Sequence, residues 1–358
     1  MSQGLLYSGA NNYLGTNTGD GSAQWSDAAL SVSSNINDKL RGGIQLHFYQ
    51  LGMFGGNKVE IDWATADYRF NDKVGVRAGK VKTVFGLFND SQDIDAVHMW
   101  ALLPEPFYAP DNKSYTLSHN GGDVYGSIDL GKKFGKLAYT GYGGEHSVDL
   151  DSGYVELMQE DTQFALSFNQ APSGSVFGGD LRWHLPVKGA LVGASIYKTH
   201  LNGPGSLHSG GFVVNHDEPV DFYARYEKGK VFVGGEYKRT PFNATVTLLS
   251  VAPIPVVLPA VVDQRSWYVM GSYRLLDKLS VGTYYTHEVD NKAANTSLAQ
   301  NYFKDWTISS RYDFNNYFYA KAEGHFIDGT NIGFYSANNT NGLTPKTKLL
   351  ALKLGFSF

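Results

Sequence analysis

The chain has 358 residues, of which 18% are charged and 14% are aromatic, with 41 glycines and a formal net charge of −4 at pH 7. This small negative charge excludes the concentrated positive field that nucleic-acid binding requires. The lack of cysteine excludes disulfides, zinc–thiolate sites, thiol nucleophiles and covalently attached c-type haem. No run of about 18 apolar residues is present, so the sequence predicts no transmembrane helix.

Segments in which apolar and polar residues alternate recur along the chain, and each predicts a β-strand with one apolar and one polar face. In chain order the predicted strands are 3–7, 25–36, 40–49, 59–70, 74–84, 124–130, 137–142, 176–184, 190–197, 220–226, 231–237, 267–275, 279–285, 306–312, 318–326 and 347–358. Within 59–70 the apolar phase shifts between Trp63 and Tyr68, which predicts a β-bulge near Ala64 to Ala66. Residues 162–168 also alternate, and they are interpreted either as a hairpin arm within a loop or as a further strand.

The connections between these segments are alternately short and long. Tight turns such as Asn37-Asp38-Lys39 and Asn71-Asp72-Lys73 alternate with long polar gaps. About sixteen strands with this asymmetry predict an all-β fold, a transmembrane antiparallel β-barrel with short periplasmic turns and long extracellular loops. Closure would give every backbone N–H and C=O a partner inside hydrocarbon. The alternative is a soluble β-sandwich, in which a second sheet covers the apolar faces.

The last segment shows the two predicted faces most clearly. Leu350, Leu352 and Leu354 share the apolar face, and Ala351 and Lys353 lie on the other. Aromatic residues at strand ends predict the interfacial girdles of a membrane barrel. These residues are Trp25, Trp267, Tyr273, Tyr285, Trp306, Tyr312 and Phe326. We expect a protein of the bacterial outer membrane whose signal peptide has been removed, with Met1 added to the mature chain.

The longest segment without alternation, residues 85–121, separates the fifth and sixth predicted strands. Loops this long in compact proteins usually carry function, and a sixteen-stranded barrel encloses a water-filled channel that an inward loop would narrow. We therefore expect this third long loop to fold into the lumen as a constriction loop. Its ionisable groups are mainly acidic, with Asp90, Asp93, Asp95, Glu105 and Asp111 against Lys113.

Charged residues on the polar strand faces are expected to line the lumen. The expected basic residues are Arg41, Arg69, Arg77, Arg182, Arg225, Lys238, Arg274, Arg311, Lys321 and Lys353. The expected acidic residues are Glu60, Asp62, Asp67, Asp123, Asp129, Asp180, Asp221, Glu236, Asp305 and Glu323. A balanced wall facing an acidic loop predicts a transverse field across a general pore. Arg77, with Lys80 and Lys82 at the root of the loop, is the strongest single candidate for the constriction.

The first 110 residues or so contain motifs that resemble trimeric Gram-negative porins of the phosphate-selective and dicarboxylate-porin type. The motifs are VEIDWATADYRF at 59–70, VRAGKVK at 76–82 and FGLFND at 85–90, together with Gln3-Gly4 and Asn11-Asn12-Tyr13-Leu14-Gly15. The rest of the chain is similar only in its strand rhythm and its terminal Phe358. The resemblance implies a sixteen-stranded trimer, a third loop in the lumen and basic residues along an anion path. This chain has Val84 where the motif usually has proline.

The sequence therefore predicts a single domain over residues 1–358, a porin for passive diffusion of small hydrophilic solutes and ions, with anion preference as one option. Its expected partners are outer-membrane lipid, lipopolysaccharide and two further copies of the chain, without a cofactor. The alternative is a non-transporting barrel, either an enzyme or a sheath for an electron-transfer partner, although no G-x-S-x-G nucleophile motif is present.

Two further segments carry weaker expectations. A calcium site at Asp90, Asp93 and Asp95 is an alternative, although the spacing lacks the glycine and glutamate of an EF-hand. Residues 241–262 are rich in Val and Leu for a loop that should meet water, so we expect an apolar extracellular loop that packs against protein.

Overall fold

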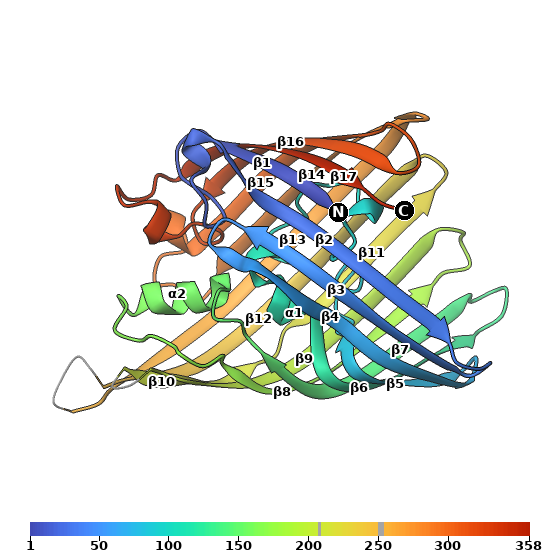
Figure 1. Cartoon of the computed structure of the whole chain (residues 1–358), viewed down its shortest axis with the longest axis horizontal. Coiled ribbons are helices and arrows are strands. Elements are labelled where there is room, and N and C mark those ends of the chain that lie inside the picture. Colours follow the sequence, from blue (N-terminus) through green and yellow to red (C-terminus); the bar gives the residue numbers. More distant parts are fainter. Residues whose placement is uncertain (207–208, 250–253) are drawn as a thin grey trace.

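Hydrogen bonding between the first and the last strand closes the sheet of this protein on itself. In the computed structural model, which describes residues 1–206, 209–249 and 254–358, β1 (Ser2–Ser8) pairs antiparallel with β17 (Lys346–Phe356). Because β1 also pairs with β2 (Ser22–Asn35), the sheet has no free edge at this seam. Figure 1 shows the resulting barrel with its tilted strands.

The remaining strands follow the chain order around the barrel, antiparallel to their neighbours. They are β3 (Leu40–Leu51), β4 (Phe54–Asn71), β5 (Val74–Lys82), β6 (Ser118–Asp129), β7 (Lys136–Ser147), β8 (Ser173–His184), β9 (Ala190–Pro204), β10 (Gly210–Asp217), β11 (Val220–Lys228), β12 (Val231–Leu248), β13 (Val256–Leu276), β14 (Leu279–Asp290), β15 (Tyr302–Asp313) and β16 (Phe318–Gly329). The described helices are α1 (Lys113–Leu117) and α2 (Gly153–Asp161), with 3₁₀ turns at Thr18–Asp20, Asp95–Val97, Pro110–Asn112, Ala299–Asn301 and Ser336–Asn338. No helix among them is long and apolar enough to cross a membrane.

Two of the seventeen described strands share one position, so the wall has sixteen positions. β11 pairs with one half of β9 and of β12, and β10 pairs with the other half of each. The break between β10 and β11 contains Pro219, which has no N–H to donate to a ladder. The predicted sixteen-stranded antiparallel barrel is therefore confirmed.

The connections at the two ends of the barrel differ in length, as predicted. At one end, called the turn end here, residues 36–39, 72–73, 229–230 and 277–278 join neighbouring strands, and both chain termini lie on this side (Figure 1). The opposite end, called the loop end, carries the long connections. One connection departs from the prediction, since only Gly52 and Met53 join β3 to β4 at the loop end. Gly52 has the φ of +56° that this tight turn needs.

The two faces of each strand meet different surroundings. On β17, Leu350, Leu352 and Leu354 lie on the outer surface, whereas Ala351 and Lys353 are buried in the interior. The apolar faces therefore form the outside of one closed sheet, as a barrel in lipid requires. The described strands form one sheet, whereas the sandwich alternative requires two.

Six of the seven aromatic residues predicted as girdles are exposed on the outer surface, namely Trp267, Tyr273, Tyr285, Trp306, Tyr312 and Phe326. The prediction is wrong for Trp25, which is 2% exposed and has Nζ of Lys353 at 4.4 Å from its ring. Pairing between β2 and β3 is unbroken from Trp25 opposite Leu51 to Asn35 opposite Arg41, so Trp25 lies on the same face of β2 as Asp27 and Ser31, opposite to the outward Leu30 and Val32. Trp25 therefore faces the interior.

The β-bulge in β4 is at Asp62, two residues before its predicted position. Gln45 lies opposite Trp63 and Leu46 lies opposite Ile61, so Asp62 has no partner in the ladder. Two successive side chains, those of Asp62 and Trp63, then face lumenal pockets. This extra inward residue is the origin of the phase shift in the sequence.

The connection 148–172 contains α2, which the strand pattern did not predict. Oγ of Ser152 accepts a hydrogen bond from the N–H of Val155 and caps the helix. Residues 162–168 follow the helix without forming a strand. Leu166 is fully buried there in an apolar cluster with Val155, and Phe168 packs against this cluster, whereas Phe164 is exposed.

Residues 241–262 are mainly strand and not loop, because β12 and β13 pair from Pro241 opposite Asp263 to Leu248 opposite Val256. The backbone N–H and C=O groups of β12 and β13 form hydrogen bonds with each other along this stretch, so the two strands extend together as a long hairpin. Its inner side packs into the cluster with α2 and β10, as expected, through Ala244 and Val246. Residues 250–253 of this stretch lie outside the described residues.

Candidate functional site

The predicted constriction loop, residues 85–121, is residues 83–117 in the structure, because β5 ends at Lys82 and residues 118–121 already belong to β6. The loop leaves the wall after β5, runs through the lumen and rejoins the wall at β6. Gly86 permits the inward turn, because its φ is +67° and a Cβ at this position would lie 2.5 Å from Oε2 of Glu236. The N–H of Gly86 donates to Oγ of Ser195 (2.9 Å) on β9. Val84 is buried two residues before this turn. The predicted inward path of this loop is confirmed.

One side of the loop is fixed to strands β9 to β14 by a buried carboxylate and an apolar cluster. Oε2 of Glu236 accepts from the N–H of Leu87 (2.9 Å), and its Oε1 accepts from the hydroxyls of Tyr108 (2.5 Å) and Tyr268. The cluster between loop and wall consists of Leu87, Phe88, Trp100, Tyr108, Leu191, Tyr223, Tyr268, Met270 and Tyr284. Packed side chains therefore fill the space between the loop and this part of the wall.

Acidic residues of the loop bind basic residues of the wall. Asp90 forms an ion pair with Arg182 on β8 (2.9 Å). Asp95 binds Lys321 on β16 (3.0 Å) and Lys353 on β17 (2.7 Å). These contacts lie on different strands, so they hold the loop on several sides at once.

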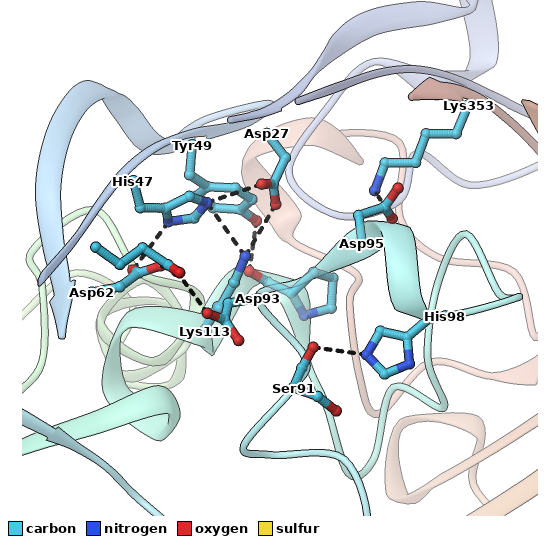
Figure 2. Close-up of polar contacts among 12 residues, drawn as sticks. Asp27, His47, Tyr49, Asp62, Ser91, Asp93, Asp95, His98, Lys113 and Lys353 are labelled. Carbon is cyan, nitrogen blue, oxygen red and sulfur yellow. Dashed lines mark hydrogen bonds and ion pairs between the residues drawn. The ribbon is translucent and has the colours of Figure 1, made fainter. Parts of the chain in front are cut away.

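A chain of polar contacts crosses the gap between the loop and strands β2 to β5 (Figure 2). His47 on β3 lies between two carboxylates, with Nε2 at 3.1 Å from Asp27 and Nδ1 at 3.2 Å from Asp62. Lys113 of α1 donates to the second oxygen of Asp27 at 3.0 Å. Helix α1 is thereby tied to the wall.

Gln45, two residues before His47, extends this chain towards the turn end. Its amide nitrogen donates to Asp62 (2.8 Å) and to Asp93 of the loop (2.6 Å). Lys82 completes it with an ion pair to Asp93 (2.7 Å). We call this set the constriction chain, and it comprises Lys113, Asp27, His47, Asp62, Gln45, Asp93 and Lys82.

Burial inside the lumen changes the pKa values of ionisable loop residues. Burial opposes ionisation of Asp95, but Lys353 and Lys321 hold the pKa of its carboxyl well below the usual range. Burial lowers the pKa of His98 to about 4, and its Nε2 lies 2.8 Å from the carbonyl oxygen of Ser91. Burial raises the pKa of Asp111 to about 6. Burial and the nearby Asp111 raise the pKa of Glu105 well above its usual value.

Open space lies on both sides of the constriction chain. A loop-end pocket of about 80 Å³ touches the chain at His47, Asp62 and Lys113. A turn-end pocket of about 310 Å³ touches it at Gln45 and Lys82. A second turn-end pocket of about 620 Å³ lies beneath the loop, next to β8 and β11 to β15. The constriction chain therefore separates two polar spaces that open toward opposite ends of the barrel.

Arg77, Lys80 and Lys82, which were predicted together at the root of the loop, make different contacts in the lumen. Arg77 pairs with Asp123 (2.7 Å) and lines the smaller turn-end pocket. Lys80 lines the loop-end pocket and donates to the carbonyl of Ile61 (2.6 Å). Of the three, Lys82 belongs to the constriction chain.

The other predicted basic residues differ in position. Arg41 lines the smaller turn-end pocket, and Arg225 and Arg274 line the larger one. Arg311 also lines the larger pocket and donates to the loop carbonyls of Ala96 (2.6 Å) and His98 (2.8 Å).

Two predicted site residues do not face open parts of the lumen. Arg69 pairs with the almost fully exposed Asp72 (3.1 Å) at the surface of the turn, because β4 ends there. Glu105 is 4% exposed, and its Oε1 has no hydrogen-bond partner among the described residues. Neither residue belongs to the constriction chain.

The ion pairs of three acidic loop residues revise two predictions, the transverse field across the pore and the alternative of a calcium site. Asp90, Asp93 and Asp95 each contact a different basic partner, so their charges are balanced in place. No described group of three or more carboxylate or histidine side chains is arranged to hold a metal ion. Asp90, Asp93 and Asp95 therefore attach the loop to the wall.

Sequence reasoning missed Asp27, His47 and Gln45 as members of the site. The available signal was the polar face of β3, where Gln45 and His47 alternate with Ile44, Leu46 and Phe48. The alternation places them in the lumen, but nothing local indicates that the loop reaches them.

Comparisons with known proteins extend the description of the fold. No protein-family model and no curated protein sequence matches the chain. Several solved structures, however, match this chain over almost the full length of both proteins. Vibrio cholerae OmpT in its trimer form has 14% identity and a TM-score of 0.56, with 100% of this chain and 97% of that chain covered. An anion-selective porin from Comamonas acidovorans has 11% identity and a TM-score of 0.57, with 100% and 99% covered.

Salmonella typhi OmpF in complex with daunomycin has 15% identity and a TM-score of 0.57, with 100% of this chain and 97% of that chain covered. At such identities the likeness concerns the fold. The chain is therefore similar in fold to porin barrels, and the phosphate-selective or dicarboxylate type stays a prediction.

Proposed function

We propose that this chain is a porin of the bacterial outer membrane, which lets small hydrophilic solutes and ions diffuse passively along the constriction chain. The observation that carries the proposal is the arrangement of the wall, apolar outside and polar inside, around a lumen that its own loop narrows. In that setting the lumen provides an aqueous path and the loop sets its width.

The finer parts of the proposal have separate support. A homotrimer of single-domain subunits in contact with lipid and lipopolysaccharide is supported by the fold likeness to a solved trimer form. Exposed apolar residues on the outer side of the long β12–β13 hairpin, such as Val257 and Val261, offer a surface for a neighbouring subunit. Chemical cross-linking of the folded protein tests this, and a monomer in every lipid and detergent would contradict it.

An anion preference is supported by the turn-end pockets, where Arg41, Arg225 and Arg274 line open space. Among the described residues these three form no ion pair. Reversal potentials across a bilayer with different salt concentrations on its two sides test the preference. A cation-selective potential would contradict it.

The alternative of an enzyme or a protein sheath has less support. The loop and its apolar cluster occupy the centre of the lumen, and the pocket beneath the loop has about 620 Å³. A folded electron carrier needs far more room than this. We therefore propose transport and not catalysis.

Planar-bilayer conductance of the purified protein is the direct test. The natural chain has no cysteine, so one introduced thiol is a unique handle. Glu60→Cys places it in the loop-end pocket, and Lys132→Cys places it at an exposed turn outside the pockets. We expect stepwise conductance that a charged thiol reagent reduces in Glu60→Cys but not in Lys132→Cys.

Two results would count against the proposal in different ways. A protein that folds in lipid but conducts no ions would contradict the porin function. Full conductance after complete modification of Glu60→Cys would show that ions bypass the constriction chain.

A further inference from the structure

The charges along the proposed ion path are separated from one end of the barrel to the other. Among the residues that the structure describes, six acidic side chains and three lysines line the loop-end pocket. Three basic side chains and one carboxylate line the smaller turn-end pocket. The larger turn-end pocket has five basic and three acidic side chains. The loop end is therefore acidic, and the turn end is basic.

Contacts in the loop-end pocket leave part of the acidic charge without a counter-charge. Lys58 pairs with Asp151 at 3.1 Å. Glu60, Glu145 and Asp149, by contrast, form no ion pair within the described ranges. Glu60 lies within electrostatic reach of Asp149 and Asp151 and also of Lys58 and Lys80. These three unpaired carboxylates therefore face one unpaired ammonium group, that of Lys80. This side of the constriction therefore attracts cations and repels anions.

The turn end has the reverse balance. Arg77 and Asp123 neutralise each other, and Arg182 is balanced by Asp90 and Asp180. Arg41 donates only to the hydroxyl of Ser33, a neutral group, as far as the described contacts extend. Arg41, with Arg225, Arg274 and Lys230 in the larger pocket, forms no ion pair among the described residues, and neither do the carboxylates Asp67 and Glu227. Four cations against two carboxylates leave positive charge facing the water below the constriction chain.

We propose that this axial separation of charge makes the pore rectify ionic current. The inference rests on the proposed porin function. The acidic pocket enriches cations and the basic pockets enrich anions, because clefts lined by one sign of charge concentrate counter-ions. A voltage that is positive on the loop side drives both kinds of ion from their enriched side toward the constriction. The opposite voltage drives both away from it and depletes the constriction of carriers.

Current–voltage curves of oriented single channels test the inference. Thr296→Cys, in the exposed connection after β14, is labelled from one side to report the orientation. At 0.1 M salt we expect about twofold more current when the loop side is positive, and a ratio near unity at 1 M, where the Debye length falls from about 10 Å to about 3 Å.

Charge-neutral variants link the effect to the two ends of the path. Glu60→Gln with Glu145→Gln removes acidic charge from the loop end, and Arg41→Gln with Arg274→Gln removes basic charge from the turn end. Each pair should bring the current ratio toward unity at 0.1 M salt. The control, Lys132→Gln with Lys188→Gln, removes two charges at exposed turns outside the pockets and should keep the ratio.

The possible outcomes separate this inference from the function on which it rests. A folded barrel without conductance contradicts the porin proposal. Conductance with a symmetrical current–voltage curve at 0.1 M salt, or rectification that survives both pairs of substitutions, overturns the axial inference and leaves the porin function intact.

Discussion

Lys353 on the closing strand β17 lies 2.7 Å from Asp95 of the constriction loop, although 258 positions separate them in the chain. Lys321 on the neighbouring strand β16 approaches the same carboxylate oxygen at 3.0 Å. One carboxylate thus contacts two buried ammonium groups. Figure 2 shows the contact between Asp95 and Lys353. The strands that close the barrel therefore also hold its loop.

Replacement of Asp95 by Asn should release this part of the loop. Removing one partner of a buried ion pair costs about 3–5 kcal/mol, because the remaining charge stays desolvated without compensation. We expect faster hydrogen exchange of amides in residues 83–117, measured by mass spectrometry on the folded barrel. Asp277→Asn, at an exposed turn, is the matched control. Unchanged exchange in Asp95→Asn would contradict the assigned role of this contact.

Gly86→Ala should disturb the root of the loop more than an equivalent change elsewhere. The backbone φ of Gly86 is +67°, and an added Cβ would meet Glu236 at 2.5 Å and Tyr108 at 2.9 Å. Backbone strain of this kind costs about 1–3 kcal/mol. Gly229 has a similar φ of +63° but nothing within 4 Å of an added Cβ, so Gly229→Ala measures the backbone cost alone.

The measurement for this pair is the urea midpoint of unfolding, monitored by the gel mobility of the folded barrel. Gly86→Ala should have the lower midpoint. Equal midpoints would mean that the loop root can move away from Glu236 without cost.

Asp111 should make the stability of the barrel depend on pH between about 4 and 6. Burial raises its pKa to about 6 in the folded protein, against about 3.9 in an unfolded chain. The folded state therefore binds the proton more tightly, so the contribution of Asp111 to stability is complete below pH 4 and is lost as the pH rises through 6. The shift corresponds to about 3 kcal/mol.

Urea unfolding of the natural chain and of Asp111→Asn at several pH values measures this contribution. Asn keeps an oxygen that can accept the hydrogen bond from the Tyr335 hydroxyl. The natural chain should lose stability from pH 4 to pH 7, and Asp111→Asn should lose less. Some pH dependence should remain in the variant, because burial also raises the pKa of Glu105. Parallel curves for the two proteins would contradict the prediction.

A charge on the outer face of the wall should impair insertion into lipid. Ile308 on β15 is 51% exposed and lies between the outward aromatic residues Trp306 and Tyr312. Arg at the midplane of a barrel in a bilayer costs about 2–4 kcal/mol. We expect less folded protein in lipid vesicles for Ile308→Arg. Ser272→Arg, whose side chain faces a turn-end pocket, should fold nearly as well as the natural chain, and equal impairment of both would argue against a lipid-facing outer surface.

Local patterns determined the wall of this protein. A strand exposes alternate residues to opposite sides, so Leu350, Leu352 and Leu354 identify the outer face of β17 from sequence alone. The same reasoning located sixteen strand positions, the turn end and the long inward loop. The girdle prediction failed for Trp25, because it followed the place of Trp25 near a strand end and not the alternation with Leu30 and Val32, which puts it on the inner face. The bulge was placed two residues from Asp62, because a shift in pairing between neighbouring strands is decided by contacts between segments and not within one.

The tertiary structure decided which charges remain available to ions in the lumen. Periodicity places Arg182 and Arg274 on the inner face alike, yet Arg182 is balanced by Asp90 and Asp180 and Arg274 lines open space. The difference arises from the path of the loop, which brings acidic residues to particular strands far away in the chain. An ion pair requires two groups within a few ångströms, and the residue spacing of a single segment carries no information about that distance.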